Sequence, residues 1–285
     1  MIQNKNIAIV GANSILGQAI YERLFNDYNV FQVYHFNTNN IKHNVNLIQI
    51  DEFIKTDLPF EVIYFIGSVI SFEEDVLTLQ RIYQTNVHLI KEISSKFVNS
   101  KIVHASSVSV YELTNKIIKE ESGVLPKNSY AMSKLWAEHI VNNHHGGGVN
   151  VRISSLFGVG MKTNTFLPRI INDAIQNKEI TVYGDGSRRQ NYISAVEASE
   201  YFCNASSYSS KVPLLATAKH SFSNLEVAQM IAQIIPEVKI VLKGKDTSAS
   251  FIYDNNFTNQ QLKINREYSF IESIKAVVLW SQKQY

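Results

Sequence analysis

The chain has 285 residues, 45% of them hydrophobic and 18% charged, with a formal net charge of +2. This composition is typical of a globular protein, and so small a charge argues against a nucleic-acid partner. Cys203 is the single cysteine, which excludes an internal disulfide. No signal peptide precedes the first apolar run, and the longest apolar stretch, residues 62–72, is too short to span a bilayer. We therefore expect a soluble, cytoplasmic protein without a membrane partner.

The first predicted unit is a strand, a glycine turn and a helix. A short apolar run at residues 5–10 leads into a turn between Gly11 and Gly17 and then an amphipathic run at residues 18–25. Gly11 permits a tight turn, Gly17 lets the helix pack on the strand, and the free N–H groups of the helix suit a pyrophosphate. A plain strand–helix turn also uses Gly, Asn and Ser, but this context favours a dinucleotide site. The expected cofactor contacts are Gly11, Asn13, Ser14, Ile15, Leu16 and Gly17.

The end of the second predicted strand, residues 30–36, bears on the choice of cofactor. An NAD site normally has an acid here for the ribose hydroxyls, whereas this chain has Tyr34, His35 and Asn37. No arginine stands there to hold the 2′-phosphate of NADP either. Because nothing repels a phosphate and His35 can donate to one, the sequence slightly favours NADP(H) over NAD(H). A neutral pocket could still accept NAD.

Further strands alternate with helices, which predicts parallel strand–helix–strand units. A third strand is expected at residues 45–50, ending at Asp51, and a fourth at 60–66, ending at Gly67. Ligands bind beyond the carboxyl ends of such strands, so Phe65, Ile66 and Gly67 are expected near the cofactor. Asp51 fits an adenine contact or a simple loop residue equally well. A long helix is expected at 74–97 and a fifth strand at 101–105.

Tyr130 and Lys134 stand four residues apart in a predicted helix, so they share one face. A free tyrosine titrates near 10, too high for work at neutral pH. A cation about 4 Å away could stabilise the phenolate by roughly 4 kcal/mol and bring the pKa into range. A surface helix with a solvated lysine would show the same spacing, so the pair alone is weak evidence for catalysis.

The remaining elements are less regular. Adjacent His144 and His145 have no acidic or cysteine neighbours, so they are read as a loop and no metal site is expected. A sixth strand is expected at 149–153. Beyond it, helices are expected at 166–176, 196–205, 223–235 and 268–282, and strands at 179–183, 213–216 and 238–242.

Several ordered motifs resemble the extended short-chain dehydrogenase/reductase family, in the NAD-dependent epimerase/dehydratase group that acts on nucleotide sugars. Gly11, Ser14 and Gly17 align with its three-glycine turn, with serine in the middle position. The other matching segments are Asn86-Val87, Ser106-Ser107-Val108-Ser109-Val110-Tyr111, Tyr130 with Lys134, Arg152 with Phe157-Gly158-Val159-Gly160, and Tyr183-Gly184-Asp185-Gly186-Ser187 with Asn191-Tyr192-Ile193. The resemblance covers nearly the whole chain.

The resemblance implies an α/β fold: a doubly wound parallel Rossmann sheet with a smaller C-terminal substrate-binding domain. Residues 1–155 would form the dinucleotide-binding domain. Residues 156–285 would be mainly substrate-binding, with some segments returning to the Rossmann core. A homodimer is also expected.

The resemblance further implies that Ser107, Tyr130 and Lys134 are catalytic. Tyr130 would transfer the hydroxyl proton, Ser107 would bond the same oxygen, and Lys134 would lower the tyrosine pKa and bind the nicotinamide ribose. Asn86 would contact the cofactor, and Ser107, Ser155, Arg188 and Arg189 the substrate. The family's diphosphate arginine usually stands at the position of Gln190, and Arg189 is its neighbour.

Within the family, related dehydratases carry an extra acid pair after the catalytic hydroxyl, whereas Val108 and Ser109 follow Ser107 here. A 4,6-dehydratase is therefore disfavoured. An NAD(P)-dependent reduction of a 4-keto nucleotide sugar is favoured, because no acid follows the second strand. An NAD-dependent C4 epimerase and a non-catalytic dinucleotide-binding protein remain the alternatives.

Overall fold

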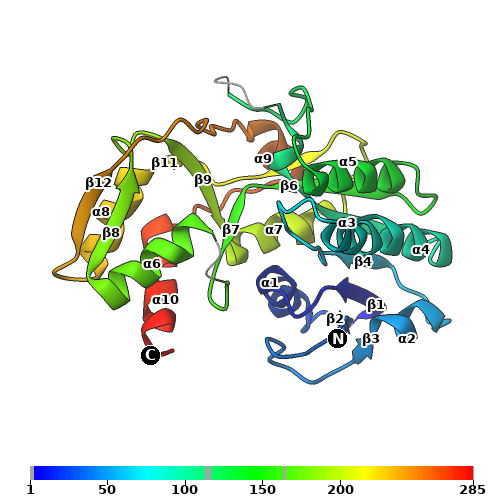
Figure 1. The fold of residues 1–285 in the computed structure, drawn as a ribbon. Coiled ribbons are helices and arrows are strands. Elements are labelled where there is room, and N and C mark those ends of the chain that lie inside the picture. The colour runs from blue at the N-terminus through cyan, green and yellow to red at the C-terminus, as the bar shows by residue number, and fades with distance from the viewer. Residues whose placement is uncertain (1–2, 113–116, 163–164, 285) are drawn as a thin grey trace.

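A seven-stranded parallel sheet forms the centre of the computed structural model, which describes residues 3–112, 117–162 and 165–284. Its order is β10-β6-β5-β4-β1-β2-β3, so the strand order reverses beside β1 (Figure 1). The strands are β1 (Gln3–Val10), β2 (Tyr28–Tyr34), β3 (Leu47–Gln49), β4 (Val62–Phe65), β5 (Lys101–Ser107), β6 (Gly148–Ile153) and β10 (Leu214–Ala216). Ile7 pairs with Val30 in parallel register, and every other pair in the sheet is also parallel. The predicted doubly wound sheet is confirmed.

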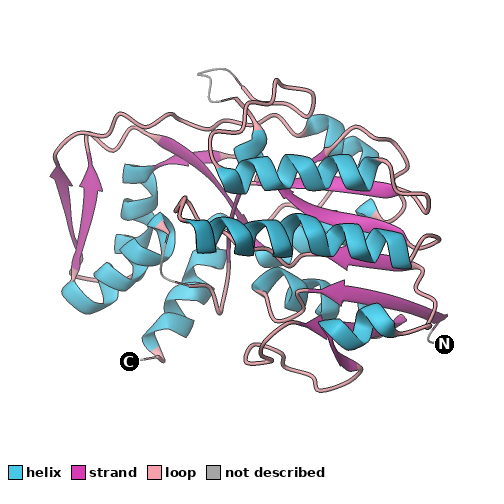
Figure 2. Ribbon diagram, turned by 45° about the vertical axis from the view of Figure 1, so that its right-hand side comes forward, coloured by secondary structure: helices cyan, strands magenta, loops and turns pink. Residues whose placement is uncertain are grey.

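Helices cover both faces of this sheet because successive strand side chains point to opposite faces and apolar ones lie on both. Ile7 and Ile9 belong to a core with α1 (Ile15–Leu24) and α7 (Ala195–Ala205). Ala8 and Val10 point to the opposite core, which contains α2 (Ile50–Lys55), α4 (Leu89–Lys96) and α5 (Ser129–Asn142). Strand side chains alternate between faces, and a sheet buried on both faces therefore reads as a continuous apolar run. Figure 2 shows long helices lying across one face of the sheet.

A third hydrophobic core lies beyond the carboxyl ends of the strands, at the left of Figure 1. It is built mainly from residues after 156 and joins three helices to short strands around Tyr192 and Phe157. Its elements are β7 (Ser155–Phe157), α6 (Phe166–Asn177), β8 (Glu179–Tyr183), β9 (Arg189–Ser194), β11 (Ser221–Ser223), α8 (Asn224–Ile234), β12 (Lys239–Lys243) and α10 (Phe270–Gln282). Strand β9 pairs with β7 and β11, and β12 pairs with β8.

The structure departs from the sequence expectations at several elements. The helix expected at 74–97 is three segments: α3 (Val76–Ile82), a π-helical segment η1 (Tyr83–His88) and α4. The strand expected at 45–50 is shorter, because Ile50 begins α2 and the Gln49 side chain accepts from the Asp51 amide. Strands β7, β9 and β11 and helix α9 (Asn256–Leu262) were not expected. They are short and polar, so they lack the periodicity that reveals longer elements.

Candidate active site

The glycine turn is shaped by a close approach of two backbone segments. Gly11 has a φ of +91°, and a Cβ there would lie 2.5 Å from the Gly67 nitrogen at the end of β4. A Cβ on Gly17 would lie 2.6 Å from the Gly11 carbonyl oxygen. Ser14 begins α1 by accepting from the Gly17 amide at 3.0 Å. The turn therefore presents a helix N-terminus and a bare backbone, which suit a pyrophosphate.

Neutral amides occupy the end of β2. Asn13 donates to the Asn37 side chain at 3.3 Å, and Asn40 donates to the Asn13 carbonyl at 3.1 Å. His35 is exposed and stacks on Phe36. Asp51, named above as a candidate adenine contact, is exposed in the first turn of α2 and does not end a strand. The region therefore contains groups that can donate and accept hydrogen bonds, including the His35 imidazole.

The loop after β4 is tied to α5 through Asn86 in η1. This fully buried amide accepts from Ser68 and the Val69 amide, and donates to the Val69 carbonyl and to Ser133. All of its hydrogen-bonding capacity is used within the protein. Asn86 therefore holds this loop against α5. Its side chain has no free donor or acceptor left for the expected contact with the cofactor.

Ser107 and Tyr130 meet at the carboxyl end of β5. Tyr130 lies in the first turn of α5, which begins where the Asn128 side chain accepts from the Ala131 amide. Burial raises the pKa of Tyr130 to about 12, while the neighbouring Ser107 hydroxyl acts to lower it. The phenol is therefore protonated at neutral pH, and Ser107 lies beside it.

Lys134 lies one turn after Tyr130 and is almost fully buried. Its ammonium donates to the Ala105 carbonyl at 2.8 Å and lies 5.9 Å from the centre of the Tyr130 ring. Burial lowers the pKa of Lys134 to about 7, whereas the charge of Glu138 raises it. A small change in its surroundings can therefore switch the charge of Lys134 near neutral pH.

Two residues near the Tyr130 phenol belong to no recognised sequence motif. Glu74, in the loop before α3, accepts from both the backbone amide and the hydroxyl of Ser129, next to Tyr130. Phe72 lies edge-on to the Tyr130 ring at 6.3 Å and is exposed. The loop after β4 thus reaches the first turn of α5. Only the position of this loop beyond a strand's carboxyl end could have indicated it.

The candidate substrate arginines lie on the far side of the site, at the start of β9. Arg188 donates to the Ala249 carbonyl at 3.2 Å, and its guanidinium lies 3.9 Å from Asp246. Arg189 donates to the Ser221 carbonyl at 2.8 Å and lies 3.4 Å from Glu226. The two guanidinium groups thus have different partners within the protein. Ser155 is exposed at the start of β7.

The described part of the chain contains no group of three or more His, Cys, Asp or Glu residues arranged to hold a metal ion. Within the same residues, no helix combines the length and the apolar character needed to cross a bilayer.

A model of the NAD dependent epimerase/dehydratase family matches residues 7–209. Among curated proteins, a dTDP-D-glucose 4,6-dehydratase of Dictyostelium discoideum is 25% identical over 122 residues, which are 37% of this chain and 28% of that protein. A trifunctional UDP-glucose 4,6-dehydratase/UDP-4-keto-6-deoxy-D-glucose 3,5-epimerase/UDP-4-keto-L-rhamnose-reductase of Arabidopsis thaliana is 24% identical over 233 residues, 70% of this chain and 34% of that protein. The chain thus spans about a third of the length of these relatives.

Solved structures resemble the whole chain in fold. A UDP-N-acetylglucosamine 4-epimerase from Methanobrevibacter ruminantium in complex with UDP-N-acetylmuramic acid has a TM-score of 0.87 at 18% identity and covers 100% of both chains. A UDP-glucuronic acid 4-epimerase from Bacillus cereus in complex with UDP-glucuronic acid and NAD has a TM-score of 0.85 at 17% identity and covers 98% of this chain and 100% of that one.

Proposed function

Because the chain belongs to the NAD-dependent epimerase/dehydratase family, we propose that it is an NAD(P)-dependent oxidoreductase acting on a nucleotide-linked sugar. The observation that supports this most is the position of Tyr130 beside Ser107, with Lys134 one turn further along α5. These residues follow the carboxyl end of β5, the same edge of the sheet as the turn at Gly11. A dinucleotide bound at that edge would lie beside them.

The glycine turn fits the diphosphate of a dinucleotide. Gly11 and Gly17 have no room for a Cβ, and the first N–H groups of α1 follow Ser14. When bound, a nicotinamide cofactor supplies the hydride that this chemistry exchanges with the sugar carbon. The chain's own residues would position the sugar and move the proton on its oxygen.

Reduction is favoured because no acid follows β2, and the protonated phenol of Tyr130 is compatible with it. A phenol with a pKa raised to about 12 by burial carries its proton at neutral pH and can donate it to the oxygen of a keto sugar. Ser107 would donate to the same oxygen, and the Lys134 ammonium would stabilise the phenolate left behind. We therefore propose reduction of a 4-keto sugar.

C4 epimerisation is the second candidate, because the same three residues serve both half-reactions and the solved neighbours include 4-epimerases with NAD. Dehydration is disfavoured, since Val108 and Ser109 offer no acid or base after Ser107. A non-catalytic dinucleotide-binding protein would have no need of the Ser107–Tyr130 pair. Release of cofactor from the purified, denatured protein tests these alternatives: about one NAD per chain would favour the epimerase, and none the reductase.

The cofactor choice is testable through His35. We propose that NADP(H) is slightly preferred, since the end of β2 offers His35 and neutral amides to a phosphate. NADPH affinity is expected to fall more steeply than NADH affinity as pH rises over about 5.5–8, the range in which imidazoles lose their proton, because only NADPH carries the 2′-phosphate. Dissociation constants for both, with His35→Gln as the control, check this. Equal or tighter NADH binding throughout would overturn the preference.

The substrate diphosphate is proposed to bind at Arg188 or Arg189, because guanidinium groups pair with phosphate oxygens. Alanine at both positions is expected to raise the substrate KM about tenfold or more with a much smaller change in kcat. Steady-state kinetics measure both. An unchanged KM would place the diphosphate elsewhere. If KM rises, the two single variants show which arginine is responsible: Arg188, held near Asp246, or the more exposed Arg189 beside Glu226.

A homodimer is proposed from the apolar side chains that α3, η1 and α5 leave exposed. Leu77, Tyr83, Met132 and Trp136 are all exposed, and the rings of Tyr83 and Trp136 are 5.8 Å apart. Such a patch suits a second protein surface, and light scattering measures the mass of the assembly.

A further inference from the structure

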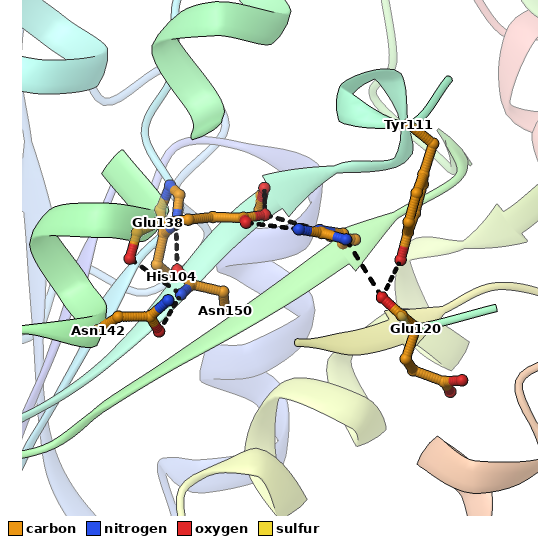
Figure 3. Close-up of polar contacts among 8 residues, drawn as sticks. His104, Tyr111, Glu120, Glu138, Asn142 and Asn150 are labelled. Carbon is orange, nitrogen blue, oxygen red and sulfur yellow. Dashed lines mark hydrogen bonds and ion pairs between the residues drawn. The ribbon is translucent and has the colours of Figure 1, made fainter. Parts of the chain in front are cut away.

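A buried carboxylate, Glu138, joins three elements of the catalytic layer. It accepts from Arg152 Nε at 2.8 Å and Nη2 at 2.7 Å, and from the Ser106 hydroxyl at 2.6 Å. These partners lie on β6 and β5, whereas Glu138 lies on α5. Glu138 and Arg152 are each about 5% exposed. Figure 3 shows Glu138 pointing from its helix into this network.

The partners of Glu138 are immediate neighbours of the proposed catalytic residues. Ser106 precedes Ser107 on β5, and Ala105, whose carbonyl accepts from the Lys134 ammonium, precedes Ser106. Glu138 itself lies one helical turn after Lys134 and therefore on the same face of α5. One carboxylate thus fixes the strand end that carries Ser107 and places a negative charge near Lys134.

Few other titratable groups face Lys134 from the elements packed around it. Tyr130 and Glu138 share its helix, and His104 faces it from β5. Burial, followed by the charge of Lys134, lowers the pKa of His104 to about 3. His104 is therefore neutral near pH 7, and its Nδ1 pairs with the Asn150 amide oxygen at 2.9 Å.

The elements that complete the surroundings of Lys134 offer neutral side chains. From η1, the amide of Asn86 contacts Ser133 and the Tyr83 ring contacts Trp136, and the buried residues of α4 are Ile90, Ile93 and Ser94. Arg152, from β6, is paired with Glu138 itself. Among these groups, Glu138 is thus the one that carries a negative charge.

Arg152 is held in place from its other side. The Tyr111 ring lies 4.5 Å from its guanidinium carbon, and the Glu120 carbonyl accepts from its Nη1 at 3.3 Å. The Glu120 side chain points elsewhere, accepting from the amide and hydroxyl of Thr258 in α9. Glu120 is thus a second buried carboxylate of the same network that makes no contact with α5, and it serves as a matched control.

Stability alone is a weak explanation for this buried pair, because well-packed apolar residues can replace buried ion pairs without loss of stability. We propose that Glu138 is a positioning residue that keeps the buried Lys134 ammonium charged and fixes the end of β5 that carries Ser107. This inference rests on the proposed function, in which the Lys134 ammonium binds the nicotinamide ribose and stabilises the phenolate.

The test is the pH dependence of NADH binding to the whole chain. NADH is the probe because the expected His35 effect concerns the 2′-phosphate of NADPH. The pKa of Lys134 is lowered by burial to about 7 and raised by Glu138, so affinity should fall as pH rises and the ammonium is lost. In Glu138→Gln the stabilising charge is gone, and the fall should begin about one pH unit lower.

Two further variants separate charge from structure. Glu138→Asp keeps the charge and should keep the wild-type midpoint even if it binds more weakly. Glu120→Gln should also keep the wild-type midpoint, although it breaks buried hydrogen bonds. If Glu138→Gln does not fold, the double variant Glu138→Gln/Arg152→Met leaves neither charge unpaired and should still show a midpoint below that of the wild type.

The outcomes distinguish this inference from the proposed function. A midpoint that moves in Glu138→Gln or the double variant, but not in Glu120→Gln, supports the role of Glu138. NADH binding with one midpoint in all variants overturns that role and leaves the proposed function intact. A wild-type protein that binds neither NADH nor NADPH contradicts the proposed function, and the role of Glu138 falls with it.

Discussion

Tyr130→Phe is expected to lower turnover about 10²–10⁴-fold, the usual contribution of general acid–base catalysis. The change removes the phenol oxygen, which lies beside Ser107 and can pass a proton to the sugar, while the buried ring is retained. Cofactor affinity should therefore stay near the wild-type value. Steady-state rates with candidate nucleotide sugars, together with NADH and NADPH titrations, measure the two effects separately.

Tyr111→Phe is the matched control for that variant. Tyr111 is equally buried, and burial raises its pKa to about 12 as well, but its phenol donates to the Glu120 carbonyl. Its loss should leave turnover within a few fold of wild type. If Tyr130→Phe keeps more than about a third of wild-type activity, or if both variants lose the same fraction, Tyr130 does not transfer the proton.

Gly11→Ala is expected to lower the free energy of unfolding by about 3 kcal/mol and to weaken binding of NADH and NADPH. Two costs add at this position. A side chain is strained at a φ of +91°, and its Cβ would lie 2.5 Å from the Gly67 nitrogen, which cannot move without displacing the loop after β4. Chemical denaturation and cofactor titration measure both consequences.

Gly147→Ala isolates the backbone strain from the steric clash. Gly147 has a similar φ of +87°, but a Cβ there would meet no atom within 4 Å. Its expected cost is therefore only about 1 kcal/mol. Equal destabilisation in the two variants would show that the approach of Gly67 to the turn does not matter.

The central sheet could be predicted from the sequence because its strands are buried on both faces. Such strands appear as apolar runs, as at residues 62–65, and the parallel arrangement follows from their alternation with helices. The polar strand β9 gave no such signal. Its residues, Arg189 to Ser194, are specified by pairing with β7 and β11, a tertiary effect that no local pattern records.

The site was predictable to the extent that it depends on local spacing. Tyr130 and Lys134 share a helix face, as expected, and Ser107 joins them because parallel strands end at one edge. The direction of the Lys134 ammonium toward Ala105 depends on burial between layers, and spacing could not reveal it. Glu138 continues the same four-residue spacing, and that signal was available in the sequence.

Strand β10 has a consequence for how the protein is made. Residues 214–216 complete the sheet by pairing with β6, and α7 covers the face that α1 occupies. While the chain emerges from the ribosome, the edge of β6 that faces away from β5 keeps its backbone groups unpaired until residues 214–216 have been synthesised. An exposed strand edge invites pairing with other chains. The nascent protein should therefore depend on chaperones until most of its length has been synthesised, and a fragment that ends before β10 should aggregate.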